Sequence, residues 1–103
     1  MHEDDIYGAR PDNSSRITLG LLNMVEADST LSQRAIASNL GIALGLTNTY
    51  LKRCIGKGLI KVSQIKANGL AYYLTPKGFA EKSRLTAEYF SQSFNLFRRA
   101  RTD

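Results

Sequence analysis

Apolar residues recur at helical spacing in three successive segments of the chain, and each segment is bounded by residues that favour helix ends. The first helix is predicted over 15–28, behind capping serines, with apolar positions at Ile17, Leu21, Leu22, Met24 and Val25. A second, shorter helix is predicted over 32–40, between the capping Ser32 and the left-handed stop Gly41. A third is predicted over 44–57, ending at Gly58, with a buried face made of Leu44, Thr47, Leu51, Cys54 and Ile55.

After Gly58 the apolar positions alternate with period two, which is typical of β-strands. Two short strands are predicted, over 59–66 and 70–75. The dipeptide Asn68-Gly69 lies between them, and both of its residues tolerate the positive φ of a type I′ turn. The pattern therefore predicts a β-hairpin.

The last segment is predicted to be a long helix that begins at Thr75-Pro76 and runs to about Arg99. It carries two apolar stripes, more than the core of so small a domain needs. We expect these residues to form a homodimer contact: Phe79, Leu85, Tyr89, Phe90, Phe94, Leu96 and Phe97. The alternative is that both stripes fold back on the first helix.

These elements predict a mainly α fold with a small β-hairpin wing. A short helix, a tight turn and a longer helix, followed by the hairpin, form a winged helix-turn-helix with a long C-terminal dimerisation helix. The expected division is a flexible lead-in over 1–13, the winged helix-turn-helix over 14–75, and the dimerisation helix with a basic tail over 76–103.

Composition excludes several classes of function. The 103 residues, 43% of them hydrophobic, suffice for one core. One histidine, His2, and one cysteine, Cys54, supply almost no material for His-based catalysis or a zinc site, so no enzyme, metal or cofactor is expected. Cys54 falls on the apolar face of its helix and is expected to be a buried, inert thiol. The acidic N-terminus does not resemble a secretory signal, and no apolar stretch approaches the ~20 residues of a membrane span, so a cytoplasmic protein is expected.

Charge is distributed unevenly along the chain. Six of the nine acidic residues lie in the first 28 positions, whereas the segment 29–80 contains no acid and seven bases: Arg34, Lys52, Arg53, Lys57, Lys61, Lys66 and Lys77. An acid-free basic tract in a folded domain attracts polyanions, and double-stranded DNA is the expected partner. A basic surface that only keeps the protein in solution is the alternative.

The third helix is expected to enter the major groove. Helical spacing turns Gly45, Asn48, Thr49 and Lys52 outward, with Leu46, Tyr50 and Arg53 on the flank. Asn48 suits adenine and Arg53 suits guanine, while Leu46 and the Thr49 methyl suit a thymine methyl. Several of these residues also have a plain structural explanation: Asn48 bonding its own helix turn, Gly45 packing on the second helix, and Tyr50 packing with only its hydroxyl in water.

Phosphate contacts are expected from two other places. Ser32, Gln33 and Arg34 begin the second helix, whose free N–H groups and positive dipole end favour an anion. Lys66 and Asn68 flank the tip of the hairpin, where a wing reaches the minor groove or its backbone.

These residues resemble winged helix-turn-helix regulators of the MarR type, and most closely the short subgroup found with exopolysaccharide gene clusters. The resemblance covers about 15–97. It is carried by Leu31-Ser32-Gln33-Arg34, Leu40-Gly41-Ile42, Leu44-Gly45 with Asn48, and Tyr73-Leu74-Thr75-Pro76-Lys77-Gly78. It implies a homodimeric, sequence-specific regulator that acts as a repressor and has no catalytic activity.

The chain departs from that pattern at Ala43, Leu46, Thr47 and Gly56, so its sequence preference is expected to differ. Full-length members of the family enclose a ligand crevice between helices from both chain ends. Because this chain has little before its first helix, a small-molecule effector is not expected, although it is not excluded. The rival function is a winged-helix module that binds other proteins and has a non-specific basic surface.

Overall fold

The computed structural model describes residues 13–66 and 69–102, with side chains described as far as Ser93. Along the chain the elements are α2 (Asn13–Ala27), α3 (Gln33–Leu40), α4 (Leu44–Gly56), β1 (Ile60–Lys66), β2 (Gly69–Leu74) and α5 (Pro76–Thr102). The predicted mainly α fold with a two-stranded antiparallel hairpin is confirmed, and the arrangement is a winged helix-turn-helix. The predicted lead-in lies outside the described residues, apart from Asn13.

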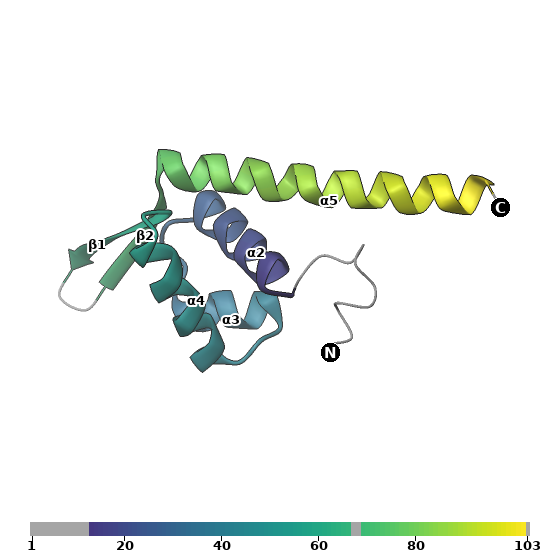
Figure 1. The fold of residues 1–103 in the computed structure, drawn as a ribbon. Helices are drawn as coiled ribbons and strands as arrows, with labels where there is room; N and C mark the ends of the chain where they lie inside the picture. Colours follow the sequence, from purple (N-terminus) through teal and green to yellow (C-terminus); the bar gives the residue numbers. More distant parts are fainter. Residues whose placement is uncertain (1–12, 67–68, 103) are drawn as a thin grey trace.

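Helix α2 lies at the centre of the domain (Figure 1). It contacts α5 on one side and α3, α4 and β2 on the other. Leu21, Leu22 and Val25 are its buried residues, and they form the core with side chains from every other element: Ile36, Leu51, Cys54, Ile60, Tyr72 and Leu85. The domain therefore has one core, built around one helix.

Local capping explains where the two short helices begin and end. The Ser32 side chain accepts a hydrogen bond from the Ala35 N–H at 3.1 Å and so caps α3. Gly41 ends α3 in the left-handed conformation at φ 69°, as predicted. Gly58, at φ 77°, follows the end of α4 and turns the chain into the hairpin.

The hairpin closes in a register that the sequence did not predict. Lys66 pairs with Gly69, so Gly69 is the first residue of β2 and not part of the turn. Positive φ among the described residues is confined to Gly41 and Gly58, which makes the expected Asn68-Gly69 type I′ turn wrong. A Cβ at position 69 would lie 3.2 Å from Cγ1 of Ile65, so Gly69 leaves room for that side chain. Asn68 lies outside the described residues.

The start of α5 is fastened to the start of the hairpin. The Thr75 hydroxyl accepts from the Gly78 N–H at 2.9 Å and lies 2.6 Å from the Gly58 carbonyl oxygen, to which it donates. The Thr75 N–H donates to the Leu59 carbonyl oxygen at 3.1 Å. The predicted helix start at Thr75-Pro76 is therefore confirmed, and the cap also joins α5 to β1.

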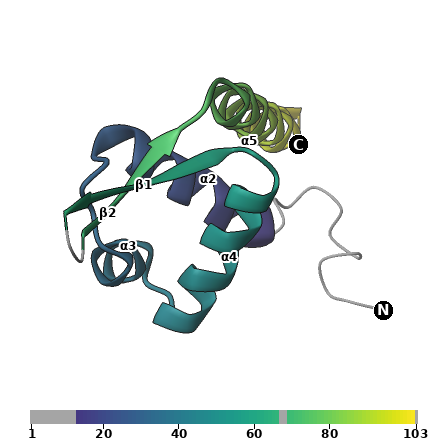
Figure 2. The ribbon, with the colours of Figure 1, turned by 90° about the vertical axis from the view of Figure 1, so that its left-hand side faces the viewer.

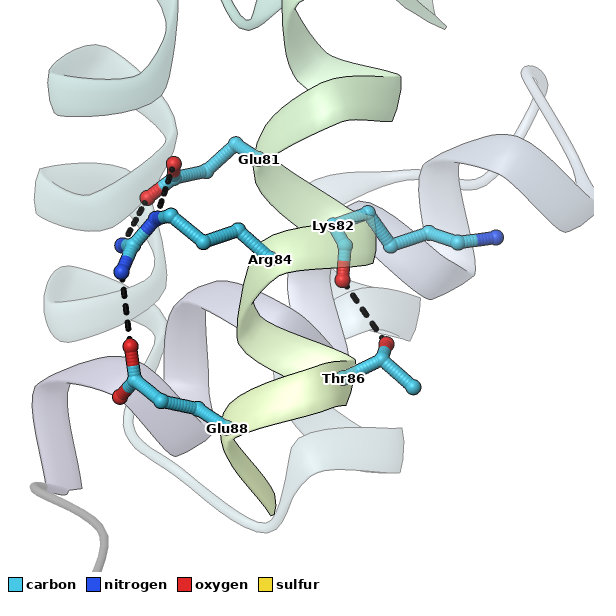
Figure 3. Close-up of polar contacts among 5 residues, drawn as sticks. All are labelled: Glu81, Lys82, Arg84, Thr86 and Glu88. Atoms are coloured by element: carbon cyan, nitrogen blue, oxygen red, sulfur yellow. Dashed lines mark hydrogen bonds and ion pairs between the residues drawn. The ribbon is translucent and has the colours of Figure 1, made fainter. Parts of the chain in front are cut away.

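Ion pairs support the first turns of α5. The Arg84 guanidinium binds the carboxylates of Glu81 and Glu88, one turn before it and one turn after it (Figure 3). Arg84 lowers the pKa of Glu81 below its ordinary value by donating hydrogen bonds to it. Lys82 pairs with Glu26 and so ties α5 to the end of α2.

Leu85, from one of the two predicted apolar stripes of α5, belongs to the core of the domain. Leu85 is 2% exposed and lies in the core, so its assignment to a dimer contact is wrong. The other stripe begins with Phe79 and Phe90, which are 50% and 63% exposed. The side chains of Phe94, Leu96 and Phe97 lie outside the described part of α5.

The junction between the start of α5 and residues 58–59 is tightest at Gly78, where a substitution tests its packing. A Cβ at position 78 would lie 2.1 Å from the Leu59 carbonyl oxygen. Because backbone has to move to relieve that contact, Gly78→Ala is expected to lower the free energy of unfolding by about 3 kcal/mol. Urea denaturation followed by circular dichroism measures this change.

Gly45→Ala is the matched control, because a Cβ at position 45 meets nothing within 4 Å. Alanine in a helix is expected to leave the unfolding free energy unchanged or to raise it by up to about 1 kcal/mol. Equal stability of the two variants would contradict the tight junction.

Candidate nucleic-acid interface

The N-terminus of α3 brings together the three residues predicted to contact phosphate. Ser32 is the cap, Arg34 is exposed, and Gln33 is half-buried. The first turn of α3 contains no acid, so its N–H groups and the Arg34 guanidinium present positive charge together. This end of the helix suits an anion such as a backbone phosphate.

Gln33 also has a structural partner that the sequence did not indicate. Its amide Nε2 donates to the Tyr72 hydroxyl at 3.2 Å, and the Tyr72 N–H donates to the Ser29 carbonyl oxygen at 3.0 Å. Tyr72 is 4% exposed and belongs to β2. These bonds join the hairpin to the start of α3. Apart from the position of Tyr72 on an alternating strand, nothing in the sequence indicated that it bonds to Gln33 and Ser29.

The buried face of α4 is rotated relative to the prediction. Its buried residues are Thr47, Tyr50, Leu51 and Cys54. Leu44, expected in the core, is 42% exposed, because it stands in the first turn of α4 while the buried stripe is centred on 47, 50, 51 and 54. Tyr50, expected on the flank, is 9% exposed. The burial predicted for Leu44 was therefore wrong, whereas Tyr50 follows the alternative in which its ring packs in the domain.

The outward face of α4 is small and carries no acid. Gly45, Thr49, Lys52 and Gly56 are all exposed and follow one another at helical spacing. A Cβ at Gly45 or Gly56 would meet nothing within 4 Å, so packing on α3 does not account for Gly45. The Thr49 hydroxyl donates to the Gly45 carbonyl oxygen at 3.1 Å. Thr49 is thus held in a defined orientation on that face.

The remaining predicted residues of α4 lie on its two edges. Asn48 is half-buried on one edge. Leu46 is 41% exposed on the other and, with Ile17, Leu40 and Ile42, lines a groove. The Arg53 guanidinium carbon lies 4.9 Å from the centre of the Tyr50 ring, a cation–π contact that holds Arg53 beside the helix. Tyr50 thus contributes to this edge through its contact with Arg53.

The hairpin lies beside the pair of helices α3 and α4 (Figure 2). Lys61 and Lys66 are exposed on β1. Lys66 is therefore accessible on the described part of the wing, and its contact with DNA stays a prediction. Helices α3 and α4 and the hairpin all fall within the acid-free segment 29–80. The hairpin and both helices therefore come from one acid-free stretch of the chain.

Cys54 is buried, as predicted, and burial raises the pKa of its thiol. The described residues contain no group of three or more metal-ligating side chains. A cavity of about 160 Å³ lined by Arg53, Lys57 and Glu81 lies between α2, α4 and α5, and two larger hollows, of about 340 and 470 Å³, lie beside Leu46 and beside Phe79. Of the helices described, none is long and apolar enough to cross a membrane.

Comparison with known proteins supports this description of the fold. Residues 14–61 match a family described as winged helix-turn-helix DNA-binding. No curated protein matches the chain by sequence.

Solved structures of MarR family regulators share the fold at low sequence identity. A MarR family protein of Mycobacterium tuberculosis, solved with p-aminosalicylic acid, superposes with a TM-score of 0.67 at 20% identity over 81% of this chain and 64% of that one. The PcaV transcriptional regulator of Streptomyces coelicolor, solved with its natural ligand, gives a TM-score of 0.66 at 20% identity over 82% of this chain and 72% of that one.

A third similar structure contains DNA. A MepR mutant of S. aureus bound to an oligodeoxyribonucleotide gives a TM-score of 0.66 at 23% identity, over 84% of this chain and 63% of that one. The chain spans less than two thirds of the length of the first and third of these proteins.

Proposed function

We propose that this protein is a homodimeric transcription regulator that binds double-stranded DNA in a sequence-specific manner and acts as a repressor in the cytoplasm. The observation that carries the proposal is the exposed, acid-free outward face of α4 in a winged helix-turn-helix fold. Such a helix enters the major groove, where the donors and acceptors of each base pair differ. The oligodeoxyribonucleotide bound to MepR supports DNA as the partner.

Base contacts are assigned to α4. Gly45 and Gly56 let the helix backbone approach the groove, and Thr49 and Lys52 lie between them on the same face. Asn48 reads adenine from one edge, while Arg53 reads guanine from the other. Leu46 and the Thr49 methyl contact thymine methyl groups. These contacts determine which sequence is bound.

Phosphate contacts are assigned to the start of α3 and to the wing. Ser32 caps the helix through its side chain, which leaves neighbouring N–H groups for a phosphate. Gln33 and Arg34 extend the same site, and Lys66 and Asn68 contact the backbone at the wing. Contacts of this kind position the protein on the duplex and add affinity for any sequence.

Dimerisation is assigned to α5. This helix of 27 residues is about 40 Å long, and its C-terminal half extends beyond the rest of the domain (Figure 1). Phe79 and Phe90 are exposed along it, and Tyr89, Phe94, Leu96 and Phe97 complete the proposed surface. Pairing of two such helices sets two copies of α4 about 34 Å apart, on successive major grooves.

The similarity of the chain to the exopolysaccharide-associated subgroup of MarR regulators is part of the proposal. It is supported by Leu74-Thr75-Pro76-Lys77-Gly78, which forms the junction between the hairpin and α5. A winged-helix module that binds another protein remains the second candidate function, favoured by the exposed Phe79 and Phe90.

Selection of random duplex DNA on the purified protein at physiological salt tests the proposal directly. An inverted repeat with half-sites one helical turn apart is expected, together with a dimeric mass by light scattering. Affinity is expected to fall steeply with salt concentration, because a dimer that neutralises six or more phosphates binds about 10³-fold or more weakly at 200 mM than at 50 mM salt. Recovery of no motif would favour the protein-binding module.

Arg34→Ala and Asn48→Ala separate the two kinds of contact. Arg34→Ala is expected to weaken binding to selected and random duplexes alike and to reduce the slope of log affinity against log salt by about 1 for each phosphate that is no longer neutralised. Asn48→Ala is expected to reduce discrimination between the two duplexes by about 1–3 kcal/mol with the slope unchanged. Fluorescence anisotropy titrations at several salt concentrations measure both quantities.

Lys77→Ala is the matched control for these titrations, since it removes the same charge from the first turn of α5, outside the proposed contacts. Its affinity and slope are expected to equal those of the parent protein. If Arg34→Ala and Asn48→Ala also behave like the parent protein, the proposed docking is wrong.

Phe90→Glu tests the dimer. Because Phe90 is 63% exposed in the single chain, a charge there leaves the domain folded but opposes burial of α5 against a second copy. A monomeric mass and at least about a 100-fold loss of affinity for the selected repeat are expected. Ser91→Glu places the same charge on the next residue, which is also exposed, and is expected to remain dimeric. A dimeric Phe90→Glu variant would place the contact elsewhere.

A further inference from the structure

The tip of the hairpin presents two apolar side chains to solvent. Ile65 is 52% exposed and Leu70 is 46% exposed, although other apolar residues of the hairpin, such as Ile60, Ala71 and Tyr72, are buried in the domain. Ile65 and Leu70 come from different strands, close to the turn. Two exposed apolar residues at the end of a narrow projection are not part of the domain core.

Ile65 lies at an irregularity in the pairing of the hairpin. Gln64 pairs with Leu70 and Lys66 pairs with Gly69, so Ile65 is the extra residue of a β-bulge. A bulge redirects the side chain that it carries, and bulges are frequent beside functional sites. Gly69 has no Cβ, and Cγ1 of Ile65 would lie only 3.2 Å from one. Ile65 is thus seated against the glycine backbone.

The charge around these side chains indicates what they contact. Lys61 and Lys66 are exposed on the same strand, and no acidic residue occurs between positions 29 and 80. An apolar tip beside an exposed lysine, Lys66, suits a duplex minor groove, in which phosphates line the two edges and polar base edges form the floor, with the apolar base faces stacked behind them. Proteins that bend DNA insert isoleucine or leucine between base steps from this groove.

We propose that Ile65 and Leu70 form an apolar wedge that enters the minor groove, partly unstacks one base step and bends the duplex. This inference rests on the proposed DNA-binding function and deepens it. The cost of unstacking depends on the base step, and flexible pyrimidine–purine steps such as TA are the easiest to open. The wing thus selects a deformable step at a position where it makes no base-specific hydrogen bond.

The test compares the parent protein with the double variant Ile65→Ser, Leu70→Ser on the selected duplex. One set of duplexes carries a donor and an acceptor dye at the two ends, so that energy transfer reports bending. A second set carries 2-aminopurine at successive flanking positions, where increased fluorescence reports unstacking. The parent protein is expected to bend the duplex by an angle in the range of about 20–90° and to increase the fluorescence at one step.

The double variant is expected to lose both signals. Its preference for a TA step over a GC step at that position, roughly tenfold or more in the parent protein, is expected to disappear. The salt slope is expected to be unchanged, since no charge has been removed. Lys66→Ala is the matched control, expected to lower the salt slope while keeping the bend. Both substituted residues are exposed, and circular dichroism checks that the variant is folded.

Three other outcomes are distinguishable. If the parent protein selects no motif, the proposed function fails, and the wedge fails with it. If the parent protein binds its motif without bending or unstacking it, or the double variant does both as well as the parent, only the wedge is overturned. If the double variant keeps the bend but changes the mass of the protein in solution, the tip is a contact between copies, which also overturns the wedge.

Discussion

The whole structure depends on the burial of one helix. Leu21, Leu22 and Val25 of α2 are almost completely buried, and α2 contacts both α5 and the pair α3 and α4. Since a chain of this length supports one core, no second packing surface exists among the described residues to position these elements independently. The direction of α4 relative to α5 is therefore determined by the side chains that surround α2. A change in that packing alters the proposed DNA-binding and dimerisation surfaces together.

A polar junction adds a second connection between the same parts. The Thr75 side chain caps α5 and bonds to the Gly58 carbonyl oxygen just after α4, while Gly78 lets the first turn of α5 approach the Leu59 carbonyl oxygen. The core holds α5 through its buried Leu85, and the polar junction holds its first turn. In a dimer paired through α5, such a rigid connection converts the dimer geometry into a defined spacing between recognition helices.

Much of the fold could be predicted from the sequence because its signals are local. Ser32, Gly41, Gly58 and Thr75 act at helix ends through their own backbone or hydroxyl, so periodicity and capping rules located the start of every helix within about two residues. What failed depends on neighbours distant in the sequence. The burial of Leu85 and the hydrogen bond between Gln33 and Tyr72 are set by tertiary packing. The hairpin turn is a local exception, because the bulge at Ile65 places Gly69 in β2 and not in the turn.

The candidate interface was predictable in its location but less so in its details, for the same reason. The acid-free segment and the outward spacing of α4 can be read directly from the chain, whereas a small rotation of the helix exchanged Leu44 and Tyr50 between surface and core. That rotation has a consequence for recognition. In the proposed complex, the contact of Arg53 with the Tyr50 ring and the hydrogen bond of Thr49 to its own helix reduce the freedom that these side chains lose on binding.

Few side chains on α4 are long enough to read bases, because its outward face begins and ends with glycine. Direct base contacts alone then distinguish only a few positions, centred on Asn48, Lys52 and Arg53. A protein whose recognition helix makes few base contacts distinguishes DNA sequences most readily by the shape and deformability of the duplex. In the proposed complex, the exposed apolar tip of the wing responds to that deformability, so sequence recognition is shared between α4 and the hairpin.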